Sequence, residues 1–157
     1  AALQWLAGRF EKRTGVECRF RTSHEHIGTE GHALPDGVPL VAYRTAQEAL
    51  TNISKHAQAS RVTMDLSISG GVLSLEISDN GRGLSRADLA KASSFGIRGL
   101  HERASTVEGW IDLSSGRSGT TLILSVPLTA GARAAPTGFE TDGDDDRDHD
   151  PSAWSAL

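Results

Sequence analysis

Residues 62–77 constrain the fold of this chain more than any other stretch of its sequence. Apolar and polar residues alternate on both sides of Gly70-Gly71, and the apolar positions are Val62, Met64, Leu66, Ile68, Leu73, Leu75 and Ile77. Alternation with a period of two is typical of strands that bury one face, and a Gly-Gly pair between two such runs favours a two-residue turn. The sequence therefore predicts an antiparallel hairpin whose apolar face other elements must cover.

Helical periodicity supplies those covering elements. Apolar residues recur at helical spacing in three segments, residues 3–10, 42–57 and 97–107. Gly15 and Gly109 are placed to end the first and third helices, and the second is entered after Pro39. Shorter alternating runs at 16–20, 110–114 and 120–126 predict further strands. We therefore expect an α+β fold, a two-layer α/β sandwich in which a mostly antiparallel mixed sheet packs on helices.

Charge divides the chain into two parts. Residues 129–157 hold two basic and seven acidic residues, a net charge of −5, whereas residues 1–128 hold fourteen basic and thirteen acidic residues. We interpret 1–128 as one domain and 129–157 as an acidic, disordered tail. The nearly neutral body gives no indication of nucleic-acid binding. No apolar run reaches the roughly 18–20 residues of a membrane span, and the single cysteine, Cys18, is expected to be structural.

Three polar constellations carry the chemistry, and the first lies on the long helix. Glu48, Asn52 and His56 recur every four residues, and each step of four advances only about 40° past a full helical turn. An amide oxygen suits magnesium, and a carboxylate one turn away could act as a base. On its own, however, such a stripe is more often a solvated helix face.

The second constellation is Asp79-Asn80-Gly81-Arg82-Gly83, which follows the second hairpin strand. By parity, Asp79 falls on the same inward face as the apolar residues before it. A carboxylate at the edge of an apolar layer needs a donor partner, and the exocyclic amine of adenine is one. Gly81 and Gly83 would let the backbone approach a planar base closely. Alone, the segment slightly favours an ordinary Asn-Gly turn.

The third constellation opens the last helix. Phe95-Gly96-Ile97-Arg98-Gly99-Leu100 places two glycines where helix N–H groups and the helix dipole favour phosphate. Ser118-Gly119-Thr120-Thr121 adds hydroxyl groups that could line the same pocket. A lone Gly-x-x-Gly pattern is weak evidence for phosphate binding, and the three constellations together are more specific than any one of them.

In order and spacing, the three constellations resemble the N, G1 and G2 boxes of the GHKL ATPase superfamily, and no Walker A loop is present. Within it, residues 43–57, 79–83, 96–104 and 118–127 resemble NarL-type two-component sensor histidine kinases, as does the opening Phe10-Glu11-Lys12-Arg13-Thr14-Gly15-Val16. The resemblance covers about residues 1–128. It implies the GHKL, or Bergerat, ATP-binding fold and a protein histidine kinase catalytic domain that uses ATP and Mg²⁺.

The resemblance also implies residue roles. Asn52 would coordinate Mg²⁺, and Glu48 would be the base for the acceptor histidine. Asp79 would hold the adenine amine, with glycines of the second constellation beneath the base. The other implied nucleotide-binding residues are Lys55, His56, Gly81, Gly83, Gly96, Gly99 and Thr120. Residues 84–95 would form a lid that closes on ATP.

The family's phosphoacceptor helices do not appear in this sequence, so the acceptor histidine is expected on a separate dimerisation domain of the parent kinase. A response regulator would act downstream. The resemblance implies a homodimeric parent, a monomeric isolated domain and a cytoplasmic location, and it leaves open whether the parent is membrane-anchored. Two alternatives stay open: a degenerate nucleotide-binding module without catalysis, and a serine kinase of the same superfamily that regulates a sigma factor.

Overall fold

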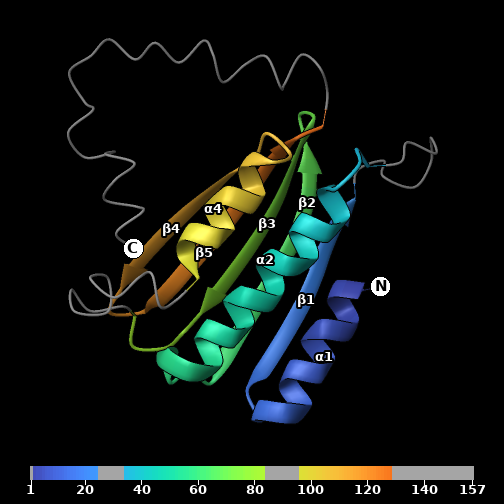
Figure 1. The fold of residues 1–157 in the computed structure, drawn as a ribbon. Helices are drawn as coiled ribbons and strands as arrows, with labels where there is room; N and C mark the ends of the chain where they lie inside the picture. Colours follow the sequence, from blue (N-terminus) through green and yellow to red (C-terminus); the bar gives the residue numbers. More distant parts are fainter. Residues whose placement is uncertain (1, 25–33, 84–95, 129–157) are drawn as a thin grey trace, which may run out of the picture.

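The computed structural model describes residues 2–24, 34–83 and 96–128 (Figure 1). The predicted lid, 84–95, and the predicted tail, 129–157, lie outside these described residues. The elements are α1 (Ala2–Thr14), β1 (Glu17–His24), α2 (Val38–Asn52), the π-helical turn η1 (Ile53–Ala57), β2 (Arg61–Ser69), β3 (Val72–Asp79), α4 (Ile97–Ser105), β4 (Trp110–Gly116) and β5 (Gly119–Pro127).

The five strands form one sheet in the order β1-β2-β3-β5-β4. Only β1 and β2 are parallel, and every other neighbouring pair is antiparallel. Figure 1 shows the helices together on one face of the sheet, with α1 nearest β1 and α4 nearest β4. The predicted two-layer sandwich with a mostly antiparallel mixed sheet is confirmed.

The core lies between the helices and the sheet. Each helix turns its apolar stripe inward, so that Phe10 of α1, Leu50 of α2 and Leu100 of α4 are almost fully buried. The inward residues of β3 and β5, among them Leu75 and Leu124, form the facing layer. Burial of these side chains supplies most of the stabilising free energy, at about 25 cal/mol for each Å² of apolar surface removed from water.

The central hairpin forms as the alternation predicts. Leu66 pairs with Leu75, and Met64 pairs with Ile77. Gly70 and Gly71 both have positive φ, which a two-residue type I′ turn requires and which glycine adopts without strain. The inward parity of β3 continues to its last residue, so Asp79 reaches the inner face with 7% of its surface exposed.

The long helix differs from the prediction at both ends. It begins at Val38, so Pro39 lies in its first turn, where a missing N–H costs no hydrogen bond. Regular α geometry stops at Asn52, and η1 continues the chain until Gln58 turns it into the left-handed region. The last helix also ends before the predicted residue 107: α4 stops at Ser105, and the N–H of Gly109 donates to the carbonyl of Ala104 at 2.8 Å. No helix among the described residues has the length and apolar character needed to cross a membrane.

Cys18 lies in the core, with its Sγ 3.9 Å from Sδ of Met64. Burial, with a smaller contribution from the charge of Glu11, raises the pKa of the Cys18 thiol to about 11. We therefore expect Cys18 in the folded chain to react with a thiol reagent at pH 8 roughly 100-fold more slowly than a free cysteine. The reaction is followed by absorbance in buffer and in urea. Rapid modification without urea would contradict the burial seen here.

Candidate functional site

A pocket lies between the C-terminal half of α2 and the inner face of the sheet. The open space within it, including the part that faces solvent, is about 520 Å³. Its wall is largely apolar, and three residues bring polar side chains to it: Asn52, Asp79 and Thr120. The full lining is Ala49, Asn52, Ile53, Ala57, Ile77, Asp79, Gly83, Ile97, Leu113, Thr120 and Leu122.

Asp79 is the buried charge of this pocket. Its Oδ1 accepts a hydrogen bond from the backbone N–H of Gly81 at 2.8 Å. Burial raises the pKa of the Asp79 carboxyl, and the N–H groups of Gly81 and Thr120 act in the opposite direction. A carboxylate held in an apolar wall is an expensive group to bury without a ligand, and such groups are frequent at functional sites.

The two glycines after Asp79 allow the chain to pack against its own backbone. A Cβ on Gly81 would lie 2.1 Å from the carbonyl oxygen of Ala57, and the neighbouring Arg82 N–H donates to that oxygen at 2.8 Å. A Cβ on Gly83 would lie 2.0 Å from the carbonyl oxygen of Gly116. Gly83 lines the pocket, whereas Gly81 is not among the lining residues. The two glycines therefore allow the loop after β3 to pack between η1 and the β4–β5 turn. The sequence did not reveal this structural reason for glycine at these two positions.

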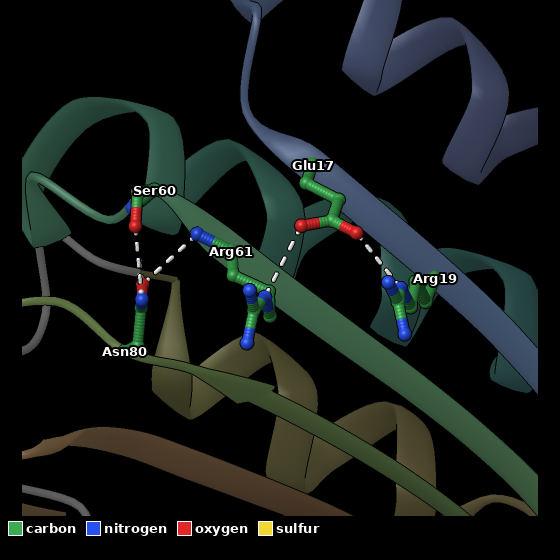
Figure 2. Close-up of polar contacts among 5 residues, drawn as sticks. All are labelled: Glu17, Arg19, Ser60, Arg61 and Asn80. Carbon is green, nitrogen blue, oxygen red and sulfur yellow. Dashed lines mark hydrogen bonds and ion pairs between the residues drawn. The ribbon is translucent and has the colours of Figure 1, made fainter.

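Asn80 holds this loop against the start of β2 (Figure 2). Its Oδ1 accepts hydrogen bonds from the N–H groups of Ser60 at 3.0 Å and Arg61 at 2.9 Å, and its Nδ2 donates to Oγ of Ser60 at 2.9 Å. Figure 2 also shows Glu17 between Arg19 and Arg61, at 2.8 and 3.1 Å. These exposed ion pairs, with Arg19 first, lower the pKa of Glu17, and such pairs contribute little stability in water.

We expect Asn80→Ala to lower the free energy of unfolding by about 1–2 kcal/mol, because two backbone N–H groups lose their acceptor. Urea denaturation followed by circular dichroism measures the change. Ser60→Ala is the matched control, since it removes only the single bond from Asn80 Nδ2. Equal stability of Asn80→Ala and the unmodified chain would show that the clamp contributes nothing.

Gly119 sets the approach of β5 to the end of β3. Its φ is +127°, and a Cβ there would lie 1.9 Å from the carbonyl oxygen of Asp79. Both features exclude any other residue without rearrangement. The same closeness brings the next residue, Thr120, to the pocket, where its hydroxyl lies 3.0 Å from Oγ of Ser115.

We expect Gly119→Ala to destabilise the fold by about 2–4 kcal/mol through backbone strain and overlap with Asp79. Gly116→Ala, in the same β4–β5 turn, should change stability by less than about 1 kcal/mol, because nothing lies within 4 Å of its added Cβ. Thermal unfolding of both variants makes the comparison. Equal melting temperatures for the two variants would contradict the close packing of β5 on Asp79.

Glu48 and Gly96 meet at the start of α4. Gly96 has φ +72°, and a Cβ there would lie 2.2 Å from Oε1 of Glu48. The half-buried Glu48 carboxylate therefore lies against the first turn of α4, beside the pocket residue Ile97. Asn52, one helical turn further along α2, lines the pocket itself. The structure thus brings the first and third constellations together.

The remaining predicted residues lie further from the pocket wall. Lys55 is exposed on η1. Gly99 lies in the first turns of α4, where an added Cβ would lie 3.8 Å from the guanidinium of Arg103. The common direction predicted for Glu48, Asn52 and His56 assumed α geometry throughout. Because the π turn follows Asn52, that expectation does not extend to His56, whose side chain lies outside the described residues.

Sequence reasoning missed two features that shape the site. The first is the π turn η1, which follows Asn52 directly. Such π-helical segments frequently occur at functional sites. The role of Asn80 was the other, because an Asn-Gly pair signals a turn whether or not the amide has a distant partner. The apolar wall from β4 and α4, at Leu113 and Ile97, was visible only as strand and helix periodicity.

Residues 36–130 match the family described as histidine kinase-, DNA gyrase B- and HSP90-like ATPases. The chain belongs to this family. The match includes α2, η1 and the strands and helix that line the pocket, so the predicted ATP-binding GHKL fold is confirmed for this ATPase domain.

Relatives of this ATPase domain narrow the family further. Histidine-protein kinase/phosphatase DegS of Brevibacillus brevis is 36% identical over 121 residues, which are 76% of this chain and 30% of DegS. Oxygen sensor histidine kinase NreB of Staphylococcus carnosus is 32% identical over 82% of this chain and 36% of NreB. These similarities confirm the predicted catalytic domain of the NarL-type histidine kinases. The ATPase domain spans about a third of the length of these relatives.

Solved structures agree on the fold of this ATPase domain. The histidine kinase domain of the Erythrobacter litoralis EL346 blue-light activated kinase superposes with a TM-score of 0.64 at 19% identity, covering 87% of this chain and 63% of that one. Histidine kinase AdeS of Acinetobacter baumannii gives a TM-score of 0.60 at 12% identity, covering 81% and 61%. At such identities the likeness concerns the fold alone.

Proposed function

We propose that this domain binds Mg–ATP in the pocket around Asp79 and donates the γ-phosphoryl group to a histidine on a separate phosphoacceptor domain. The observation that carries the proposal is the buried Asp79 carboxylate at the wall of an apolar pocket, within a family of ATPases. An adenine ring matches such a pocket because its faces are apolar and its exocyclic amine can donate to Asp79.

The residues present suit a nucleotide with its magnesium ion. Asn52 brings an amide oxygen to the pocket and is the proposed Mg²⁺ ligand, since Mg²⁺ prefers oxygen ligands and keeps several waters. When bound, the ion would neutralise charge on the phosphates and polarise the transferred group. Gly96, Gly99, Lys55, His56 and Thr120 are proposed to surround the nucleotide.

Glu48 is proposed as the base that accepts a proton from the attacking histidine. Its carboxylate lies beside the start of α4, where helix N–H groups favour a phosphate. A carboxylate at this position is one helical turn from the proposed Mg²⁺ ligand, Asn52. Base and metal ligand would therefore act on the same phosphoryl group.

The proposed partners follow from the relatives, which are longer sensor histidine kinases. We infer a dimerisation and phosphoacceptor domain in the parent protein, a homodimeric parent, and a response regulator that receives the phosphoryl group. The domain studied alone would be a monomer that lacks an acceptor histidine. Residues 1–128 are proposed to form the catalytic domain, with 129–157 as a separate acidic segment.

The test supplies the missing acceptor. The chain is incubated with radiolabelled ATP, magnesium and a separately purified phosphoacceptor domain of a NarL-type kinase, and the product is assayed for acid-labile, alkali-stable phosphate. Label on the acceptor histidine is the expected result. Tight nucleotide binding without transfer would favour a degenerate binding module, and alkali-labile phosphoserine on a supplied protein would favour a serine kinase.

A further inference from the structure

A second hollow lies on the surface of the helix layer, between α1 and α2 and away from the Asp79 pocket. It is lined by Trp5, Leu6, Arg9, Phe10, Arg13, Tyr43, Gln47, Leu50 and Thr51. Leu6, Phe10 and Leu50 form its buried floor, because they belong to the core. We call this feature the α1–α2 groove.

The α1–α2 groove combines an aromatic end with a cationic rim. Trp5 is 56% exposed, which is unusual for so large an apolar side chain, and the guanidinium of Arg9 lies over its ring at 5.2 Å from the centroid. Arg13 continues the rim one turn further along α1. No acidic residue lines the groove, and no described acidic residue pairs with either arginine. The groove therefore presents positive charge beside apolar surface.

The chain itself contains a segment of opposite character. Residues 129–157 carry a net charge of −5, and six of their seven acidic residues lie between Asp142 and Asp150. Two aromatic residues, Phe139 and Trp154, flank that acidic run. The family match ends at residue 130, so this segment is not part of what the ATPase family shares.

The acidic run can reach the groove. The N–H of Leu128 donates to the carbonyl of Gly71 at 2.7 Å, at the hairpin-turn end of the sheet. β1 begins at the opposite end, where Glu17 pairs with Arg61. Figure 1 shows α1 running toward that end, so the N-terminal end of α1 is the end nearer the hairpin turn. Two strand spacings, about 10 Å, separate β3 from β1. The fifteen residues from 129 to 143 can extend about 50 Å, and even a flexible coil of that length spans about 20 Å.

We propose that the α1–α2 groove is the intramolecular docking site of the acidic segment 142–150. Arg9 and Arg13 would bind its carboxylates, since guanidinium groups bind carboxylates in paired hydrogen bonds. One of the two flanking aromatic residues, Phe139 or Trp154, would pack on the exposed face at Trp5 and Tyr43. Because the contact is largely ionic and exposed, it weakens as salt rises.

The test uses the full chain with a spin label in the tail. Ser152→Cys places a nitroxide two residues after the acidic run, and the buried Cys18 thiol is left unlabelled at neutral pH. The readout is the intensity of the three tryptophan indole signals in a nitrogen–proton NMR spectrum. Trp154, beside the label, is the positive control. Trp110, on the opposite edge strand β4, is the negative control.

Docking predicts that the Trp5 indole signal loses most of its intensity, that it recovers when the nitroxide is reduced, and that Trp110 keeps its intensity. Combining Arg9→Glu with Arg13→Glu should restore the intensity of the Trp5 indole signal. Lys12→Glu, which makes the charge change of one of those two substitutions at an α1 residue outside the groove lining, should leave the broadening in place. An unchanged Trp110 shift shows that each variant is folded.

Three outcomes would overturn the proposal. Full Trp5 intensity in the labelled chain would show that the segment does not dock there. Equal broadening of the Trp5 signal in the Arg9→Glu, Arg13→Glu variant would show that the two arginines do not bind the acidic segment. If isotope-labelled chain without nitroxide loses Trp5 intensity when mixed with spin-labelled chain, the occupant is a second copy and not the chain's own tail.

Discussion

Replacing Asp79 by alanine is expected to weaken binding of a non-hydrolysable Mg–ATP analogue by about 10-fold to 100-fold, the loss of one charged hydrogen bond at a buried site. The carboxylate is the buried ionisable group of the pocket wall, and the adenine amine has no other acidic acceptor among the described lining residues. Calorimetric titration of both chains gives the ratio of the dissociation constants. Binding of equal strength would remove Asp79 from the proposed contact.

The Asp79→Asn variant separates folding from binding. Burial raises the pKa of this carboxyl in the folded chain above its unfolded value, so protonation of Asp79 is more favourable in the folded chain than in the unfolded chain. The contribution of Asp79 to stability is therefore greatest below the unfolded pKa and is lost as pH rises through the folded pKa. As pH rises from the unfolded pKa of Asp79 through its folded pKa, the unfolding free energy of the unmodified chain should fall relative to that of Asp79→Asn. At neutral pH, above both pKa values, the difference should stay constant. A difference in unfolding free energy that is independent of pH would contradict the raised pKa.

The second large effect is expected at Glu48. Glu48→Gln keeps the size and most of the packing against Gly96 but removes the base, so phosphoryl transfer to a supplied acceptor domain should fall about 10²–10⁴-fold. Nucleotide binding should change little, because Glu48 is not among the residues that line the pocket. Single-turnover transfer at saturating ATP measures the rate.

Glu76→Gln is the matched control for that experiment. Glu76 is an exposed glutamate on β3, with its side chain on the sheet face that carries no helix, and the same change there should leave the transfer rate unaltered. A normal rate for Glu48→Gln at saturating ATP would show that the acceptor histidine needs no base at this position. A loss of binding and rate together would instead assign Glu48 to the nucleotide site.

Local patterns predicted much of the fold and the order of the site. The alternation around Gly70-Gly71 placed the hairpin, and its parity placed Asp79 on the inner face. Both follow from interactions between neighbours in sequence. The stripe of Glu48 and Asn52 on α2 was predictable for the same reason, because its spacing depends only on helical geometry.

The rest depends on contacts between distant parts of the chain. The π turn after Asn52 ends where the Ala57 carbonyl accepts a hydrogen bond from the Arg82 N–H. These two residues are too far apart in the sequence for a local pattern to reveal the contact. The clamp from Asn80 to Ser60 likewise spans 20 residues. The parallel pairing of β1 with β2 requires a crossover through α2, and periodicity alone does not choose a strand's neighbour.

The most direct test of the central proposal is to map the Mg–ATP analogue onto the chain by NMR. We expect saturable shifts of the backbone amides of Gly81, Gly83 and Thr120, with small changes for Ser74 and Glu76 at the middle of β3. The side-chain amide of Asn52 should move only when magnesium is present. Saturable shifts confined to other surfaces, or no shifts at millimolar nucleotide, would contradict the assignment of this pocket to ATP.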